Sequence, residues 1–180
     1  MTDVRSPAVA GMFYPANPDT LRSAIQSHLS AATPPEISGV RAVIVPHAGY
    51  VYSGPVAAYA YKLLAAQSHD PARIYVLGPS HRAWFPGVAI ADVDAFATPL
   101  GEQPVDRSFA HELAERHSIF SAISSPHVPE HCLEVQVPFI QTVFPDVPIV
   151  PMLFGEVDPA DVGLALDDAV TSEDLIIVSS

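Results

Sequence analysis

Two histidines follow apolar segments in equivalent positions, and they are the residues best placed to do chemistry. His47 follows residues 40–45 through Pro46, and His81 follows residues 73–77 through Gly-Pro-Ser. Neutral imidazoles held at strand ends suit a transition metal such as iron, copper or zinc. A lone histidine after a strand is more often a structural hydrogen-bonding residue. Two in matching positions favour a metal site, which would need at least a third protein ligand.

A second cluster of functional side chains lies in the sequence Glu-His-Cys-Leu-Glu at 130–134. His131 and Glu134 are three residues apart, so on a helix they would share one face. They could line a pocket, move a proton or orient a metal ligand. The alternative is an exposed helix start in which Glu130 sits at the positive end of the helix dipole. Cys132, the single cysteine, has no partner at metal-ligand spacing and is predicted to be a buried, inert thiol.

Other chemistries are disfavoured by the motifs and the charge. The loop at 47–54 has the spacing of neither a Walker loop nor a dinucleotide fingerprint, so no nucleotide cofactor is expected. Ser80 precedes His81 without the nucleophile-elbow pattern of hydrolases. The formal net charge of −12 provides no electrostatic footprint for nucleic acid or for an anionic membrane.

The histidines depend on strands that must be buried on both faces. Residues 40–45, 73–77 and 174–180 are short, apolar and rich in branched side chains, which is typical of strands in a parallel sheet. Residues 147–153 carry two prolines and are therefore predicted to be an edge or irregular strand. Ligands in such sheets bind beyond the carboxyl ends of the strands.

Helices alternate with these strands. Asn17 and Pro18 begin an amphipathic helix, Ser53 is predicted to cap a second one, and residues 130–144 are predicted to form a helix bent at Pro138. The alternation predicts a three-layer-like α/β fold, with a mixed or mainly parallel sheet and flanking helices, as one domain over residues 1–180.

The chain also lacks signals for export. One cysteine cannot form an internal disulfide, residues 1–5 lack the pattern of a secretory signal, and no apolar run is long enough to cross a bilayer. We therefore expect a cytoplasmic protein.

Several motifs together resemble the Memo family, whose prokaryotic members are called AmmeMemoRadiSam system protein B. They occur in the family order and span nearly the whole chain. The motifs are AVAGMFYP at 8–15, VPHAGYVYSG at 45–54, VLGPSH at 76–81, EHCLEVQVPF at 130–139 and IIVSS at 176–180.

The resemblance implies the fold of class III extradiol dioxygenases and a mononuclear iron or copper site. It places the two metal histidines on His47 and His81, and it places the His131/Glu134 segment close to the same pocket. We expect Tyr50, Tyr52 and Ser80 to line this pocket as well.

In the family the chain continues into a portion that contains the ligand cysteine, and Cys132 does not match that cysteine. We therefore expect residues 1–180 to be the N-terminal portion of the family fold, without the third metal ligand. Ending on a buried strand would leave a sheet edge uncovered, which favours self-association through the C-terminal strand.

Three functions stay open at this point. The first is a metal-binding, redox-related protein of the Memo family. The second is an extradiol-type iron dioxygenase of an aromatic substrate, which would need a complete ligand triad. The third is a non-catalytic module that binds a protein or peptide partner, for which the aromatic residues at 50–52 and 84–85 are the supporting feature.

Overall fold

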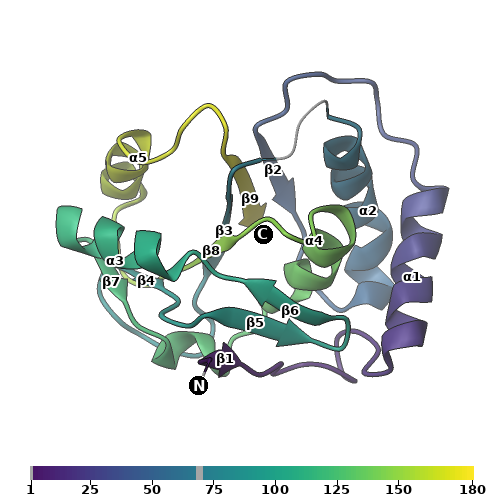
Figure 1. The fold of residues 1–180 in the computed structure, drawn as a ribbon, viewed down its shortest axis with the longest axis horizontal. Coiled ribbons are helices and arrows are strands. Elements are labelled where there is room, and N and C mark those ends of the chain that lie inside the picture. The colour runs from purple at the N-terminus through teal and green to yellow at the C-terminus, as the bar shows by residue number, and fades with distance from the viewer. Residues whose placement is uncertain (1, 68–70) are drawn as a thin grey trace.

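A six-stranded sheet forms the centre of the protein in the computed structural model, which describes residues 2–67 and 71–180 (Figure 1). Its strand order is β2-β9-β3-β8-β4-β7, and a smaller sheet has the order β1-β5-β6. The strands are β1 (Val4–Arg5), β2 (Ala42–Val45), β3 (Ile74–Pro79), β4 (Val88–Ile90), β5 (Ala95–Thr98), β6 (Gly101–Pro104), β7 (Phe120–Ala122), β8 (Ile149–Phe154) and β9 (Leu175–Ser179). The helices are α1 (Pro18–Ala31), α2 (Tyr50–Ala65), α3 (Arg107–Arg116), α4 (Val137–Val143) and α5 (Pro159–Asp167), with 3-10 turns η1 (Ser125–His127) and η2 (Glu134–Gln136).

Helices cover both faces of the main sheet. One apolar core joins α1, α2 and α4 to the sheet, and a second joins α3 and α5 to the opposite face (Figure 1). The strands β2, β9, β3 and β8 run parallel, whereas β4 is antiparallel to β8. The predicted three-layer α/β fold with a mixed, mostly parallel sheet is therefore confirmed. Within the described residues, no helix combines the length and the apolar character needed to cross a bilayer.

The two helices beside β2 begin differently. The side chain of Asn17 accepts a hydrogen bond from the backbone N–H of Thr20 (2.9 Å), so the predicted cap of α1 is confirmed. The predicted cap of α2 is wrong, because this helix begins at Tyr50, directly after Gly49, without a side-chain cap. Ser53 lies inside the first turn and donates its hydroxyl to the Ala48 carbonyl (2.6 Å).

The proline-containing strand β8 is an interior strand, which corrects the prediction of an edge strand. It pairs with β3 on one side and with β4 on the other. The carbonyls of both prolines still accept backbone hydrogen bonds. The N–H of Ile74 donates to the Pro148 carbonyl (3.0 Å), and the N–H of Ala91 donates to the Pro151 carbonyl (3.1 Å).

The C-terminal strand β9 has no free edge, which corrects the expectation that this strand is uncovered, while self-association stays a prediction. It lies between β2 and β3 and is hydrogen-bonded to both. The physical reason is the strand order, because the last strand in sequence is inserted between the first two strands of the main sheet. The strand at this end of the sheet is β2, whose Ile44 is 75% exposed, so the prediction that residues 40–45 are buried on both faces is wrong.

A buried ion pair fastens the N-terminal segment to the rest of the molecule. The Arg5 guanidinium lies 2.8 Å from a Glu134 carboxylate oxygen, and both side chains are at least 96% buried. Glu134 also accepts hydrogen bonds from the backbone N–H groups of Ala8 (2.7 Å) and Val9 (3.0 Å) and from the Tyr14 hydroxyl (2.5 Å). The irregular, packed conformation of residues 6–16 is thus organised around one carboxylate.

We expect Glu134→Gln to lower the free energy of unfolding by about 3–5 kcal/mol, because it leaves the Arg5 charge buried without a counter-charge. Chemical denaturation measures the change. Glu36→Gln, at an exposed position, is the control and should change stability by less than about 0.5 kcal/mol. Equal stabilities of the two variants would contradict the role given to the ion pair.

A pH dependence follows from His127, which is buried and lies 3.0 Å from the Ala89 carbonyl through Nε2. Burial lowers the pKa of His127 to about 3, assisted by the nearby Arg5 charge and opposed by the Ala89 carbonyl. Since the unfolded chain binds the proton near pH 6.5, this contribution to stability is complete above pH 6.5 and is lost as the pH falls towards 3. From pH 7 to pH 5 the loss is about 2 kcal/mol.

The variant His127→Gln removes the titrating group and keeps a polar side chain. Its free energy of unfolding, measured by denaturation at pH 7 and pH 5, should fall by about 2 kcal/mol less than that of the unsubstituted protein. The same pH dependence in both proteins would show that His127 does not titrate in this way.

Candidate metal centre

The parallel pairing of β2, β9 and β3 brings His47 and His81 together. Each histidine lies two residues beyond the end of its strand, at the same edge of the sheet. The two ring centroids are 5.1 Å apart. Residues far apart in the chain therefore meet because parallel strands end on the same side.

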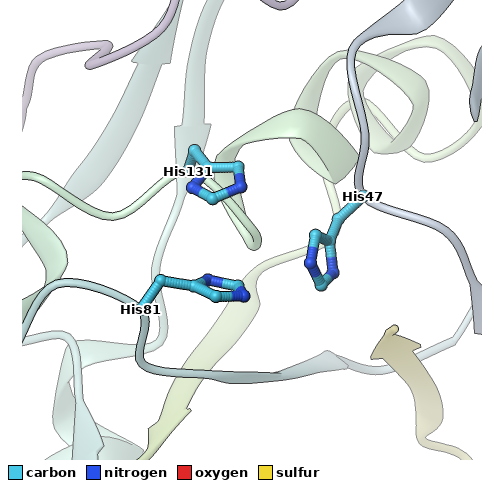
Figure 2. A group of neighbouring side chains, drawn as sticks. All are labelled: His47, His81 and His131. Carbon is cyan, nitrogen blue, oxygen red and sulfur yellow. The ribbon is translucent and has the colours of Figure 1, made fainter. Parts of the chain in front are cut away.

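His131 is the third member of this group, which we call the histidine cluster (His47, His81 and His131). Its ring centroid lies 5.0 Å from that of His81 and 5.7 Å from that of His47, and Figure 2 shows the three rings facing a common space. One ligand nitrogen from each ring lies within 4.8 Å of the other two. A third imidazole thus lies beside the two predicted donors, and the identity of the third metal ligand stays a prediction.

The carboxylate of Glu130 supports two of the three rings. One of its oxygens, Oε1, lies 3.0 Å from Nδ1 of both His81 and His131, and the side chain is 2% exposed. The same carboxylate accepts hydrogen bonds from the backbone N–H groups of His81 (2.6 Å), His131 (2.8 Å) and Cys132 (3.0 Å). Burial acts to raise the pKa of Glu130, but these hydrogen bonds outweigh it and lower the pKa to about 2. Glu130 is therefore a carboxylate at neutral pH.

The imidazoles of the cluster are suited to donate lone pairs. Burial lowers the pKa of His47, against an opposing contribution from the Ser179 carbonyl, and burial also lowers the pKa of His131. Both rings are therefore neutral at pH 7. The Nδ1 atom of His47 is buried and has no hydrogen-bond partner of good geometry among the described residues. An unpartnered buried nitrogen in such a cluster is consistent with a metal ligand.

A second group of possible donors in the described part of the chain contains His81, Glu130 and Cys132. It is less suited to a metal, because the Glu130 oxygens already accept the hydrogen bonds described above. Burial raises the pKa of the Cys132 thiol, which donates to the Pro79 carbonyl (3.1 Å). The predicted buried thiol is confirmed, and the histidine cluster is the better candidate.

Tyr50, Tyr52 and Ser80 are the remaining residues predicted to line the pocket. Tyr50 is buried, and its hydroxyl donates to the Val135 carbonyl (2.8 Å). Tyr52 is 80% exposed on α2, so the aromatic residues at 50–52 form a helical turn and not a loop. Ser80 donates its hydroxyl to the Ala83 carbonyl (2.6 Å) and thereby shapes the loop that carries His81.

Glu134 does not face the histidine cluster, which corrects the expectation that it lines the pocket with His131. Residues 131–133 are not helical, and the 3-10 turn η2 begins only at Glu134. The three-residue spacing therefore does not place the two side chains on one face. The Glu134 carboxylate instead binds Arg5 and the N-terminal segment. The helix predicted over 130–144 is likewise limited to η2 and the short α4.

Gln136 and Ser179, which were not predicted as site residues, join the segments that carry the histidine cluster. Gln136 donates to the Pro46 carbonyl (3.1 Å) and to the Ser179 hydroxyl (2.9 Å), and Ser179 donates to the Cys132 carbonyl (2.7 Å). These bonds join the end of β2, the end of β9 and the segment that carries His131. Ser179 lies at the end of a predicted strand, and this position could have indicated a role at the site. Nothing in the local sequence indicated the partners of Gln136.

A hollow of about 510 Å³ opens beside the cluster, next to His47. Its walls are mainly apolar. The lining residues are His47, Leu77, Gly78, Pro79, Phe154, Val178, Ser179 and Ser180. A small molecule in this hollow would lie next to the His47 imidazole.

Comparison with known proteins gives consistent matches along the chain. The family model described as Memo-like protein matches residues 5–180. A MEMO1 family protein of Methanopyrus kandleri is 37% identical over 182 residues, covering 94% of this chain and 64% of the relative. A MEMO1 family protein of Methanothermobacter thermautotrophicus is 36% identical over 189 residues, covering 98% of this chain and 68% of the relative. One of Ignicoccus hospitalis is 42% identical over 160 residues, covering 82% and 56%. The chain thus matches between 56% and 68% of the length of these curated relatives.

Strand β3 packs closely against residues 132–133, and this packing can be tested at Gly78. A Cβ atom at Gly78 would lie 2.7 Å from Cδ2 of Leu133 and 2.9 Å from Sγ of Cys132, and both of these side chains are buried. We expect Gly78→Ala to lower the free energy of unfolding by about 1–3 kcal/mol, because the 132–133 segment must move. Chemical denaturation measures the loss.

Gly163 in α5 offers a matched control, since a Cβ atom there meets no atom within 4 Å. Gly163→Ala should raise the free energy of unfolding by up to about 1 kcal/mol, because alanine favours the helix. If both variants were stabilised, the tight packing of β3 against the 132–133 segment would be disproved.

Proposed function

The chain belongs to the Memo-like family, and on this premise we propose that its histidine cluster binds one transition-metal ion, iron or copper, in a redox role. The observation that carries the proposal is the arrangement of three imidazoles, each with a nitrogen within 4.8 Å of the other two. Three convergent imidazoles supply three donors of a kind that transition metals prefer.

The donor chemistry supports this choice of ion. Imidazole nitrogen suits iron and copper as well as zinc, and the resemblance to the Memo family favours the first two. A metal–nitrogen bond of about 2.1 Å places two ligand nitrogens at most about 4.2 Å apart, so a cluster within 4.8 Å requires only a small closing movement. Iron or copper, when bound, would supply one-electron redox chemistry.

The protein's own contribution would be to keep the donors neutral and to balance the charge. Burial keeps His47 and His131 unprotonated, so their lone pairs are available at neutral pH. The Glu130 carboxylate provides a negative charge behind two of the rings. The hollow beside His47 leaves space for a small molecule next to the centre.

Removal of any one cluster histidine is expected to weaken metal binding at least about 100-fold, which exceeds the effect of losing an outer hydrogen-bond partner. The experiment loads the protein anaerobically with Fe(II) or Cu(I) and measures metal content and affinity by competition with a chelator. The variants are His47→Ala, His81→Ala and His131→Ala. We expect one ion per chain in the unsubstituted protein.

His111→Ala is the control, because His111 lies on α3 outside the cluster and its side chain is 52% exposed. This variant should retain full binding. Absence of stoichiometric Fe(II) and Cu(I) binding by the unsubstituted protein would refute the proposed function. Unchanged binding in His131→Ala alone would restrict the ligand set to His47 and His81.

A further inference from the structure

We propose that Glu130 is a positioning residue for this metal centre: one buried carboxylate oxygen accepts a hydrogen bond from Nδ1 of His81 and lies 3.0 Å from Nδ1 of His131, so both rings present Nε2 as the ligand atom. This inference rests on the proposed function, because positioning the rings serves a purpose only if the cluster binds a metal ion. The arrangement itself can be tested in the metal-free protein.

The partners of Glu130 are the first support for this proposal. Oε1 lies 3.0 Å from Nδ1 of His81 and 3.0 Å from Nδ1 of His131. The geometry with His81 also meets the criteria of a hydrogen bond. His81 lies 49 residues before Glu130 in the chain, so imidazoles from two distant segments lie next to one oxygen atom.

The chemistry of a carboxylate then determines which nitrogen carries the proton. An ionised carboxylate can only accept hydrogen bonds, so a neutral imidazole that binds it through Nδ1 must carry its proton there. The Nε2 atom of the same ring is left with a free lone pair. Metal-binding histidines commonly donate their other N–H to a carboxylate in this way, which fixes both the tautomer and the orientation of the ring.

A comparison with Glu134 indicates that the charge of Glu130 has a purpose beyond folding. Glu134 is equally buried, and it is paired with the Arg5 guanidinium at 2.8 Å. Among the described residues, Glu130 has no lysine or arginine within ion-pair distance, and its partners are backbone N–H groups and the two imidazoles. Hydrogen bonds already stabilise the Glu130 carboxylate, and a cation between the rings would in addition balance its negative charge.

The Glu130 side chain also joins the two segments through the backbone. It accepts hydrogen bonds from the backbone N–H groups of His81 and His131 and from the ring of His81. Substitution could therefore disturb the fold as well as the rings. The test must include a measurement that a purely structural role would not change.

The tautomers of the histidine rings provide that measurement. Long-range ¹H–¹⁵N spectra of ¹⁵N-histidine-labelled, metal-free protein at pH 7.5 distinguish Nδ1–H from Nε2–H rings. We expect His81 and His131 to be Nδ1–H tautomers in the unsubstituted protein. In Glu130→Gln, whose amide has only one acceptor atom, we expect at least one of them to change to Nε2–H or to a mixture. Glu36→Gln is the control and should leave both rings unchanged.

Metal affinity is the second measurement, with Fe(II) and Cu(I) as probes under anaerobic conditions. Glu130→Gln should weaken binding about 10–100-fold relative to the unsubstituted protein, and Glu130→Asp, which retains the carboxylate, should recover part of the loss. Circular dichroism identifies conditions in which every variant is folded.

The outcomes separate this inference from the proposed function. If His81 and His131 are both Nε2–H tautomers in the unsubstituted, metal-free protein, the positioning role of Glu130 is overturned whatever the metal affinity. It is equally overturned if folded Glu130→Gln retains both tautomers and full affinity. If the unsubstituted protein binds neither ion, the proposed metal centre is refuted. The tautomers of His81 and His131 would still show whether Glu130 orients the two rings.

Discussion

The carboxyl ends of β2, β9 and β3 meet at one edge of the sheet because the three strands run parallel, and the histidine cluster depends on this pairing. The insertion of β9 between the other two sets the spacing of the strands that carry His47 and His81. Backbone bonds continue the pairing beyond the strands, since the N–H of Ser180 donates to the Val45 carbonyl (2.8 Å) and the N–H of His47 donates to the Ser180 carbonyl (3.2 Å). The loops that carry the histidines thus begin from a rigid base.

The segment at 130–136 completes the site from outside the sheet, and two buried carboxylates hold it in different ways. Glu134 forms an ion pair with Arg5 and organises the N-terminal segment. Glu130 has no such cation among the described residues and binds the rings of the cluster. Because a buried charge must be compensated by charge or by hydrogen bonds, these two residues divide the segment into a structural half and a half that faces the candidate metal centre.

Local sequence patterns predicted the elements that depend on local interactions. The apolar runs at 40–45, 73–77 and 174–180 are β2, β3 and β9, and Asn17 caps α1. The predictions failed where long-range contacts override a local preference. The strand β8 pairs with strands on both sides although it contains a proline. Residues 131–133 are not helical, and the carboxylates of Glu130 and Glu134 on either side of them bind partners far away in the chain.

By itself, the sequence determined the three-layer α/β class, the position of His47 and His81 after two strands, and the resemblance to the Memo family. These follow from hydrophobic periodicity and from short motifs, which are properties of neighbouring residues. Only the tertiary structure decided that His131 joins the cluster while Glu134 leaves it, and that Glu130 lies behind two of the rings. The physical reason is that the hydrogen bonds and charge pairing of a buried carboxylate depend on partners up to 129 residues away, which no local spacing can specify.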